Sequence, residues 1–584
     1  MNLRPEAPTE TMAVGLRACR RHFLFAALFS ALLNLLFIVP MLYMLQVYDR
    51  VVPTRGGTTL LFLTLVLVFG LATLALLDAM RSRLLIRAGM RLDRFLSGLV
   101  LDTVLARRDR TLDTISRQAM REFDTLRQAL TGSAILALFD APWSPIYVLI
   151  CFLIDPALGV LVLVGGVLLA FITVRSEHRT IQPLQDANQA AARAYASQEQ
   201  VIAGSEVVRA LGMRRALVRN HLAERKTMLN LQTSASFAAS RYATASRFIR
   251  LALQSLALGL GALLAIHDRI SGGAIFAASF LAGRALAPID QLLASWRTVS
   301  SARGAYASLN QLLASREASF VLTSLPAPLG RIAAEEIVLL NAAGDGAILG
   351  GLSFAVGPGE VVAVVGPSGA GKSTLLRILS GGAHPTRGKV RIDGADARDW
   401  DQERLAPFIG YLPQDVSLFA GTIKQNIARF DDDANSGATD LKTVAAAKAC
   451  FAHDMILRLP GGYDSPLGWG GRGMSAGQAQ RVALARALYG EPAIILLDEP
   501  NSHLDAEGEV QLLETLAALK NRGAAVIIVA HRMGILAAVD KIMVMRDGRI
   551  EAFGERDEIA ARLRGPTGNQ RTDLQPPVAV GGAA

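Results

Sequence analysis

The sequence is poor in cysteine and in charged residues. Its three cysteines among 584 residues, Cys19, Cys151 and Cys450, form neither a CxxC motif nor a paired spacing, so neither a disulfide framework nor a zinc site is indicated. Charged residues make up only 19% and hydrophobic residues 51%, which suits a chain with part of its surface in lipid. The net charge is +10, but no nucleic-acid-binding module is visible. We interpret the excess as arginine in membrane loops and expect no nucleic-acid partner.

Internal repeats are also absent, so one chain carries one membrane half and one soluble half. Long apolar runs stop at about Ile289, and ordinary α/β sequence follows. A chain of this length is expected to form several domains. We expect a membrane domain over residues 1–314, a linker over 315–329, an α/β domain over 330–564 and a disordered tail over 565–584.

Six apolar runs are long enough to cross a bilayer, at about residues 22–46, 58–77, 134–154, 157–174, 248–266 and 272–289. The first run lacks a small-residue cleavage site, so a retained span is favoured over a signal peptide. The stretch from Gln182 to Leu229 is rich in Ala, Gln, Glu, Arg and Leu and has no proline after Pro183. We therefore expect long helices that extend the spans into the cytoplasm.

Arginines cluster before the first run and between the second and third. They are Arg17, Arg20 and Arg21, followed by Arg81, Arg83, Arg87, Arg91, Arg94, Arg107, Arg108, Arg110, Arg117, Arg121 and Arg127. By the positive-inside rule these segments are cytoplasmic. The sequence therefore predicts a multi-pass membrane protein, surrounded by membrane lipids, with both termini in the cytoplasm.

A glycine-rich segment follows the short β-branched run Val361 to Val365. Its residues match GxxxxGK[ST] and are Gly366, Pro367, Ser368, Gly369, Ala370, Gly371, Lys372 and Ser373, before a helical pattern that begins at Thr374. In this strand, loop and helix context the motif is a P-loop, whose backbone N–H groups and helix N-terminus attract phosphates. Lys372 should reach the β and γ phosphates, and Ser373 should bind Mg²⁺. We therefore expect ATP and Mg²⁺ as cofactors.

A second run typical of a buried strand, Ala493 to Leu497, ends in two acidic residues. Asp498 would hold the Mg²⁺ shell, and Glu499 could accept a proton from the attacking water. An acidic pair that caps a helix is the alternative, which the upstream P-loop disfavours. The pattern therefore indicates ATP hydrolysis.

The segment Met474 to Gln478 (MSAGQ) resembles the LSGGQ signature of the ATP-binding cassette (ABC) family and precedes Arg481 to Leu488, as in that family. Gln414 stands in a Q-loop-like segment, Asp505 in a D-loop-like segment, and His531 follows the apolar run Val526 to Val529. The fold that this resemblance implies is an all-α six-helix transmembrane domain followed by an α/β P-loop nucleotide-binding domain.

The same resemblance assigns roles. The signature residues Ser475, Gly477 and Gln478 would close over ATP held by the P-loop of a second subunit, and Asp505 would link the two sites. Glu499, His531 and Gln414 become the candidate catalytic residues, and Ser373, Gln414 and Asp498 the candidate metal ligands. Since no motif is visibly crippled, a symmetric homodimer is expected rather than a heterodimer.

One of the departures from the family concerns the nucleotide base. The stretch from Glu335 to Gly350 contains no aromatic residue, although the family usually places there a ring that stacks on adenine. We therefore expect loose selectivity for the nucleotide base.

Three strings in the membrane half resemble type I secretion permease/ATPases, in particular the protease and lipase exporter (PrtD-type) branch. They are Met41 to Pro53, Phe139 to Tyr147 and Gly283 to Ile289, the last accompanied by Trp296 and Arg297. The resemblance implies ATP-driven export of an unfolded polypeptide with a carboxyl-terminal signal, together with a periplasmic membrane-fusion adaptor and an outer-membrane channel. A lipid or drug exporter of the same fold is the alternative, and a regulatory ATPase without transport is disfavoured by the six spans. The sequence does not identify the cargo.

Overall fold

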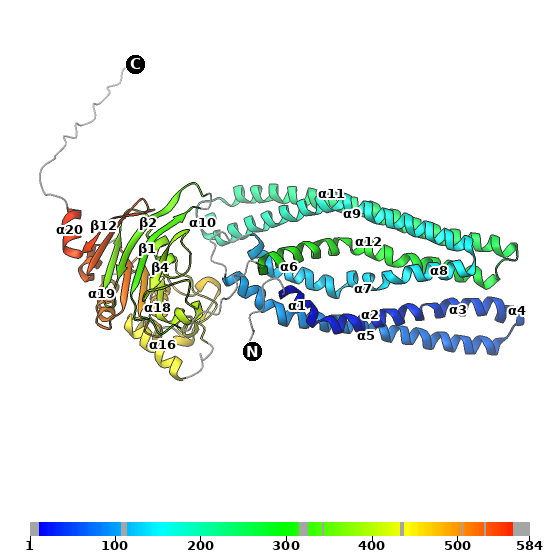
Figure 1. Cartoon of the computed structure of the whole chain (residues 1–584), viewed down its shortest axis with the longest axis horizontal. Helices are drawn as coiled ribbons and strands as arrows, with labels where there is room; N and C mark the ends of the chain where they lie inside the picture. The colour runs from blue at the N-terminus through cyan, green and yellow to red at the C-terminus, as the bar shows by residue number, and fades with distance from the viewer. Residues whose placement is uncertain are drawn as a thin grey trace, which may run out of the picture. The chain divides into compact units, whose positions relative to one another are not determined.

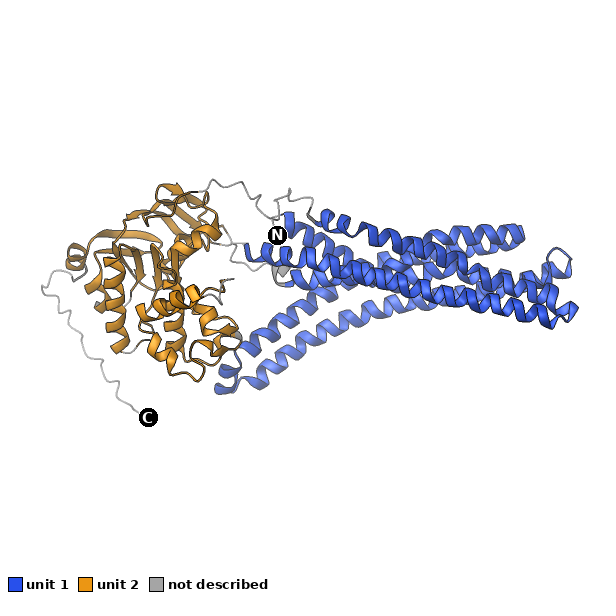
Figure 2. Ribbon diagram, turned by 90° about the horizontal axis from the view of Figure 1, so that it is seen from below, with its two compact units in different colours: residues 1–107, 111–318 blue, residues 108–110, 319–584 orange. Residues whose placement is uncertain are grey.

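The computed structural model describes residues 11–106, 114–314, 325–341, 344–431, 437–502, 504, 506–530 and 533–564. The chain forms two compact units, residues 1–107 with 111–318, and residues 108–110 with 319–584, shown in two colours in Figure 2. Most of the expected linker and all of the expected tail lie outside the described residues.

The first unit is helical. Its elements are α1 (Thr11–Ala18), α2 (Arg20–Leu36), α3 (Ile38–Gln46), the π-helix η1 (Val47–Val51), α4 (Val52–Thr54), α5 (Gly57–Ala106), α6 (Thr114–Thr131), α7 (Ser133–Asp140), the 3₁₀ turn η2 (Ala141–Trp143), α8 (Ser144–Ile154), α9 (Pro156–Ala203), α10 (Ser205–Ala210), α11 (Arg214–Ile266) and α12 (Gly272–Ala314). In the described part of the chain, six helical segments are long and apolar enough to cross a membrane, namely Arg20–Thr54, Gly57–Ala106, Gln118–Ile154, Pro156–Ala203, Arg214–Ile266 and Gly272–Ala314. Each contains one predicted run, so the six-span prediction is confirmed.

Helices α9 and α11 continue well past their apolar runs, with 48 and 53 residues, and they pack against each other (Figure 1). Asp155 caps α9 by accepting a hydrogen bond from the backbone N–H of Ala157 at 2.8 Å, and Pro156 occupies the first turn, where no N–H partner is needed. The three cysteines, Cys19, Cys151 and Cys450, are buried and unpaired.

The second unit is built around a six-stranded sheet with the order β12-β11-β3-β10-β9-β6. Its strands are β3 (Val361–Val365), β6 (Ile409–Leu412), β9 (Ile494–Asp498), β10 (Ala525–Val529), β11 (Lys541–Arg546) and β12 (Arg549–Glu555). All neighbours run parallel except β11 and β12. Every residue of β9 and β10 is buried, which is why these strands read as continuous apolar runs.

An antiparallel sheet with the order β2-β1-β4-β5 and a two-stranded sheet of β7 and β8 complete the strands. They are β1 (Ile332–Leu340), β2 (Ala347–Val356), β4 (Arg387–Ile392), β5 (Ala395–Asp396), β7 (Gly421–Thr422) and β8 (Pro466–Leu467). The helices of this unit are α13 (Lys372–Leu379), α14 (Gln402–Leu405), α15 (Ile423–Ile427), α16 (Gly437–Ala449), α17 (His453–Leu457), α18 (Ala476–Leu488), α19 (Ala506–Asn521) and α20 (Arg556–Arg564), with 3₁₀ turns at Ala406–Phe408, Gly462–Asp464, Trp469–Gly471 and Met533–Ala538. The parallel strands β3, β9 and β6 end at one edge of the large sheet, and the P-loop, Asp498 and the segment that leads to Gln414 follow them there.

Candidate functional site

The P-loop runs from the end of β3 to the start of α13. Gly366 and Gly371 both have positive φ, at 151° and 91°. A Cβ atom on Gly366 would lie 2.1 Å from the carbonyl oxygen of Met545, and one on Gly371 would lie 2.6 Å from Cδ2 of Leu349. Only glycine fits this close approach in the left-handed conformation, so the tight loop is specified by the sequence itself.

Lys372 lies at the first position of α13 and is 5% exposed. Its Nζ donates hydrogen bonds to the carbonyl oxygens of Gly366 and Pro367, each at 2.8 Å. Burial lowers the pKa of Lys372, while the negative charges of Glu499 and Asp498 oppose this shift. The ammonium group is therefore held inside the loop, where it can exchange its carbonyl partners for phosphate oxygens.

Three predicted site residues from distant parts of the chain meet beside the P-loop. The Ser373 hydroxyl donates to Oε1 of Gln414 at 3.4 Å, and Nε2 of Gln414 donates to Oε1 of Glu499 at 3.2 Å. Glu499 has a φ of 50°, which is uncommon for a residue other than glycine and typical of functional sites. The arrangement connects the helix that binds phosphate with the candidate general base.

Asp498 ends β9 and is 2% exposed. Together with Ser373 and Gln414 it offers a carboxylate, a hydroxyl and an amide oxygen, the hard donors that Mg²⁺ prefers. No group of three or more His, Cys, Asp or Glu side chains that could hold a metal occurs in the described part of the chain. Mg²⁺ takes few protein ligands and completes its shell with water and substrate phosphates.

The signature residues lie at the start of a different helix, α18. Ser475 is its N-cap: its Oγ accepts from the backbone N–H of Gln478 at 3.3 Å, and Oε1 of Gln478 accepts from the backbone N–H of Ser475 at 3.0 Å. Each side chain therefore accepts from the backbone N–H of the other residue, which forms a capping box at the start of α18. Gly477 lies in the same first turn. The donors at this helix start suit a phosphate brought from elsewhere.

The remaining predicted positions divide into two groups. Pro367, Ser368, Gly369, Ala370 and Thr374 lie in the loop and the first turn of α13 as expected, whereas Asp505 and His531 lie outside the described residues. Sequence reasoning missed Gln480 of α18, whose side chain bonds to the segment that follows β9. Its only signal in the sequence is an amide two residues beyond the signature.

Part of the stretch with no aromatic residue lies beside the P-loop. Leu349 of β2 would meet a Cβ on Gly371, and so would the carbonyl oxygen of Ile348, at 3.3 Å. Asn341 at the other end of this stretch forms a turn with Asp345, with Nδ2 donating to the carboxylate at 2.6 Å. In the described part of this stretch, the groups beside Gly371 are therefore the Leu349 side chain and the Ile348 carbonyl oxygen.

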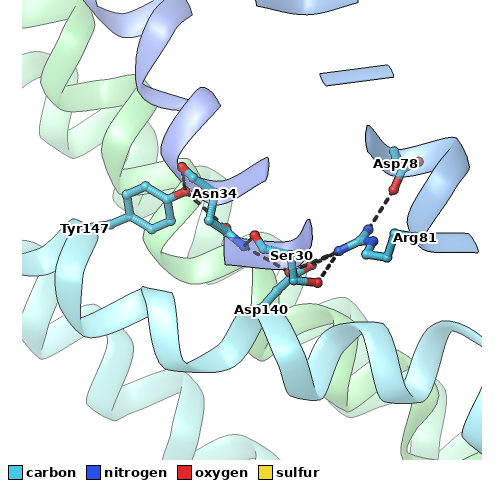
Figure 3. A network of polar contacts seen from close by, with 6 residues as sticks. All are labelled: Ser30, Asn34, Asp78, Arg81, Asp140 and Tyr147. Carbon is cyan, nitrogen blue, oxygen red and sulfur yellow. Dashed lines mark hydrogen bonds and ion pairs between the residues drawn. The ribbon is translucent and has the colours of Figure 1, made fainter. Parts of the chain in front are cut away.

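The membrane unit contains a polar network that connects four of its helices (Figure 3). Its members are Ser30 and Asn34 of α2, Asp78 and Arg81 of α5, Asp140 of α7 and Tyr147 of α8. Arg81, 8% exposed, donates to Ser30 at 2.8 Å, to Asp78 at 2.7 Å and to Asp140 at 3.2 Å. Asn34 donates to Asp140 at 3.0 Å, and the Tyr147 hydroxyl donates to the carbonyl oxygen of Asn34 at 2.8 Å.

Two residues of the second string, Phe139 to Tyr147, belong to this network, namely Asp140 and Tyr147. The other strings also make contacts between helices. Asp49 of the first string accepts from the backbone N–H of Gly273 at 2.6 Å and so caps α12. Arg284 of the third lies over the Phe37 ring, 3.3 Å from its centroid. The strings thus specify how the spans are joined.

The chain is similar to known proteins over nearly its whole length. Residues 349–502 match the ABC transporter family, and residues 23–285 match the ABC transporter transmembrane region. It is 39% identical to the type I secretion system ATP-binding protein PrsD of Rhizobium meliloti, covering 97% of each chain. It is 31% identical to the leukotoxin translocation ATP-binding protein LktB of Bibersteinia trehalosi, over 94% of this chain and 77% of that protein.

A solved structure of a bacterial Atm1-family ABC exporter with ATP bound matches with a TM-score of 0.79 and 25% identity, covering 94% of this chain and 99% of the other. The full-length match to that exporter agrees with six spans followed by one nucleotide-binding domain. The P-loop, the signature helix and the acidic end of β9 provide the chemistry of an ATPase coupled to transport. The chain therefore belongs to the ABC transporter family, among its type I secretion ATP-binding proteins.

Proposed function

We propose that this protein is the inner-membrane ATPase and permease of a type I secretion system, which exports an unfolded polypeptide carrying a carboxyl-terminal signal. The observation that carries the proposal is the match to PrsD over 97% of both chains, at 39% identity. A periplasmic membrane-fusion adaptor and an outer-membrane channel are its proposed partners. The leukotoxin exporters among the relatives point to the same class of cargo, a polypeptide.

In the proposed mechanism ATP lies with its phosphates in the cradle of residues 366–374. Lys372 leaves the carbonyl oxygens of Gly366 and Pro367 and binds the β and γ phosphates. Ser373, Gln414 and Asp498 would hold Mg²⁺, which when bound neutralises the charge that develops on the phosphates. Glu499 takes the proton of the attacking water, and Gln414, within hydrogen-bond distance of Glu499, orients that water.

The site needs a second copy of the chain. Because Ser475, Gly477 and Gln478 begin a helix of their own, we assign them to the γ-phosphate of ATP bound by the partner. Asp505 and His531 are assigned, by resemblance, to the contact between the two sites and to the γ-phosphate. ATP binding would close the homodimer and hydrolysis would reopen it, which moves the membrane helices.

Orientation follows from the positive-inside rule. The arginines just before and at the start of α2 and those along the second half of α5 would lie in the cytoplasm, and so would both termini and the nucleotide-binding domain. This placement puts ATP hydrolysis on the side where ATP is made.

The proposal is tested with purified protein in lipid vesicles. The ligand is the carboxyl-terminal segment of a protein encoded nearby. Its binding to the protein and its effect on the ATPase rate are measured at low and high salt, with a scrambled segment of the same composition as the control. We expect saturable binding and a changed rate with the authentic segment only. If lipids or hydrophobic drugs change the rate saturably and no neighbouring polypeptide does, the protein is a lipid or drug exporter.

A further inference from the structure

Gln480 lies in α18, behind the signature turn, and is 4% exposed. Its side-chain nitrogen is 2.7 Å from the carbonyl oxygen of Pro500, 3.2 Å from that of Glu499 and 3.3 Å from Oγ of Ser502. All three acceptors belong to the segment directly after β9. One buried amide therefore connects the signature helix to the backbone of the candidate general base.

The backbone of Glu499 needs such support because its left-handed conformation is disfavoured for a side chain with a Cβ atom. Its carbonyl oxygen also accepts from the backbone N–H of Ser502 at 3.2 Å, which closes a turn. From this backbone the carboxylate reaches Nε2 of Gln414. A shift of the turn would move the carboxylate away from the P-loop.

We infer that Gln480 is a positioning residue for ATP hydrolysis. It couples the position of the Glu499 carboxylate to the position of the signature helix. Helix α18 runs without a break from Ala476 to Leu488, so a phosphate that moves Ser475 also moves the amide of Gln480. In the dimer, ATP bound to the P-loop of one chain would fix the position of the signature residues of the other chain. Through Gln480, this would also position Glu499 of that other chain. The inference rests on the proposed roles of Glu499 and of the signature.

The competing explanation is that Gln480 only satisfies buried carbonyl groups, in which case its loss would lower stability and leave catalysis of the folded protein intact. The variant Gln480→Met keeps the length of the side chain and removes both N–H donors. Gln511→Met is the matched control, since Gln511 is partly exposed on α19 and donates to Glu507 at 3.3 Å. Both variants are made in the full-length protein in vesicles, without cargo.

For Gln480→Met we expect kcat to fall at least ~10-fold with KM within about twofold of wild type, because ground-state ATP contacts are untouched. The Hill coefficient for ATP should fall toward one, and Gln511→Met should behave as wild type. In a Glu499→Gln background, Gln480→Met should not lower kcat further, since Gln480 acts through Glu499, which that background already lacks. An unchanged kcat, or an equal loss in both backgrounds, would overturn the inference.

If Gln480→Met does not fold, Gln480→Glu replaces it in the same comparison with and without Glu499→Gln. This variant keeps the size of the side chain and replaces the amide donor with an acceptor. The two proposals also fail separately. If no polypeptide changes the ATPase rate but Gln480→Met lowers kcat as expected, only the secretion function is contradicted. If Glu499→Gln hydrolyses ATP normally, the proposed role of Glu499 as the base is contradicted.

Discussion

Glu499 is the residue that we propose as the general base. The variant Glu499→Gln keeps the size of the side chain and its contact with Gln414 but cannot take a proton, so we expect kcat to fall by at least ~100-fold. Nucleotide binding should persist, and a closed dimer should accumulate in ATP. Turnover is measured by phosphate release and binding with a fluorescent ATP analogue. Hydrolysis near the wild-type rate would show that another group is the base.

Lys372→Ala is expected to act at an earlier step. The ammonium group of Lys372 lies inside the phosphate loop, so its loss removes a contact made in both the ground state and the transition state. Binding itself should weaken, by at least ~10-fold in Kd, as expected for a charged contact worth about 1.5–3 kcal/mol. Titration with the same fluorescent analogue measures this loss. A variant with normal affinity and low kcat would place Lys372 among the groups that act only in the transition state.

The lack of an aromatic residue beside the P-loop, in residues 335–350, bears on nucleotide selectivity. Leu349 and Ile348 lie beside Gly371, and stacking of a base on an aromatic ring contributes about 1–3 kcal/mol in nucleic-acid complexes. Since residues 335–350 contain no ring, GTP should inhibit ATP hydrolysis with an inhibition constant within about tenfold of KM for ATP. A much larger preference for ATP would mean that a ring from outside this stretch stacks on the base.

At the scale of helices, the pair Arg81 and Asp140 joins the second span to the third, and Ser30 and Asn34 attach the first. Removing one partner of a buried ion pair leaves an uncompensated charge, which costs about 3–5 kcal/mol, whereas removing both often costs little. We therefore expect Arg81→Met, which removes the cation beside Asp140, to lower the thermal unfolding midpoint in detergent more than the double variant Arg81→Met/Asp140→Asn does. Asp140→Asn alone should lower it less than Arg81→Met, because Arg81 keeps its contact with Asp78. Strictly additive losses would show that the two side chains act independently.

Sequence patterns predicted the elements well where one period or one motif dominates. The six apolar runs, the P-loop between β3 and α13, and the acidic end of β9 needed only local information. The contacts of Arg81 with Ser30 and Asp140 could not be predicted, because these three residues are far apart in the chain and meet only after the helices pack. Gln480 was missed for the same reason: its acceptors become neighbours only when α18 packs beside the end of β9.

At the scale of the whole molecule, the cassette motifs predict that two chains share each ATP. Mixed dimers of wild type and Glu499→Gln therefore test whether the sites depend on each other. At equal amounts of both chains, interdependent sites should leave about a quarter of the wild-type rate, since only wild-type pairs turn over, whereas independent sites should leave about half. The rate is measured after mixing in detergent and reconstitution into vesicles.

The burial of all three cysteines makes this protein a convenient subject for site-directed spectroscopy. Burial raises the pKa of Cys450 to about 12 and also raises that of Cys19, so at neutral pH these thiols are protonated as well as shielded, and maleimides should react with them slowly. A single cysteine introduced on an exposed helix would then be the dominant site for a fluorophore or a spin label. Distances between two such labels in a dimer could be followed through the ATP cycle without first replacing the native thiols.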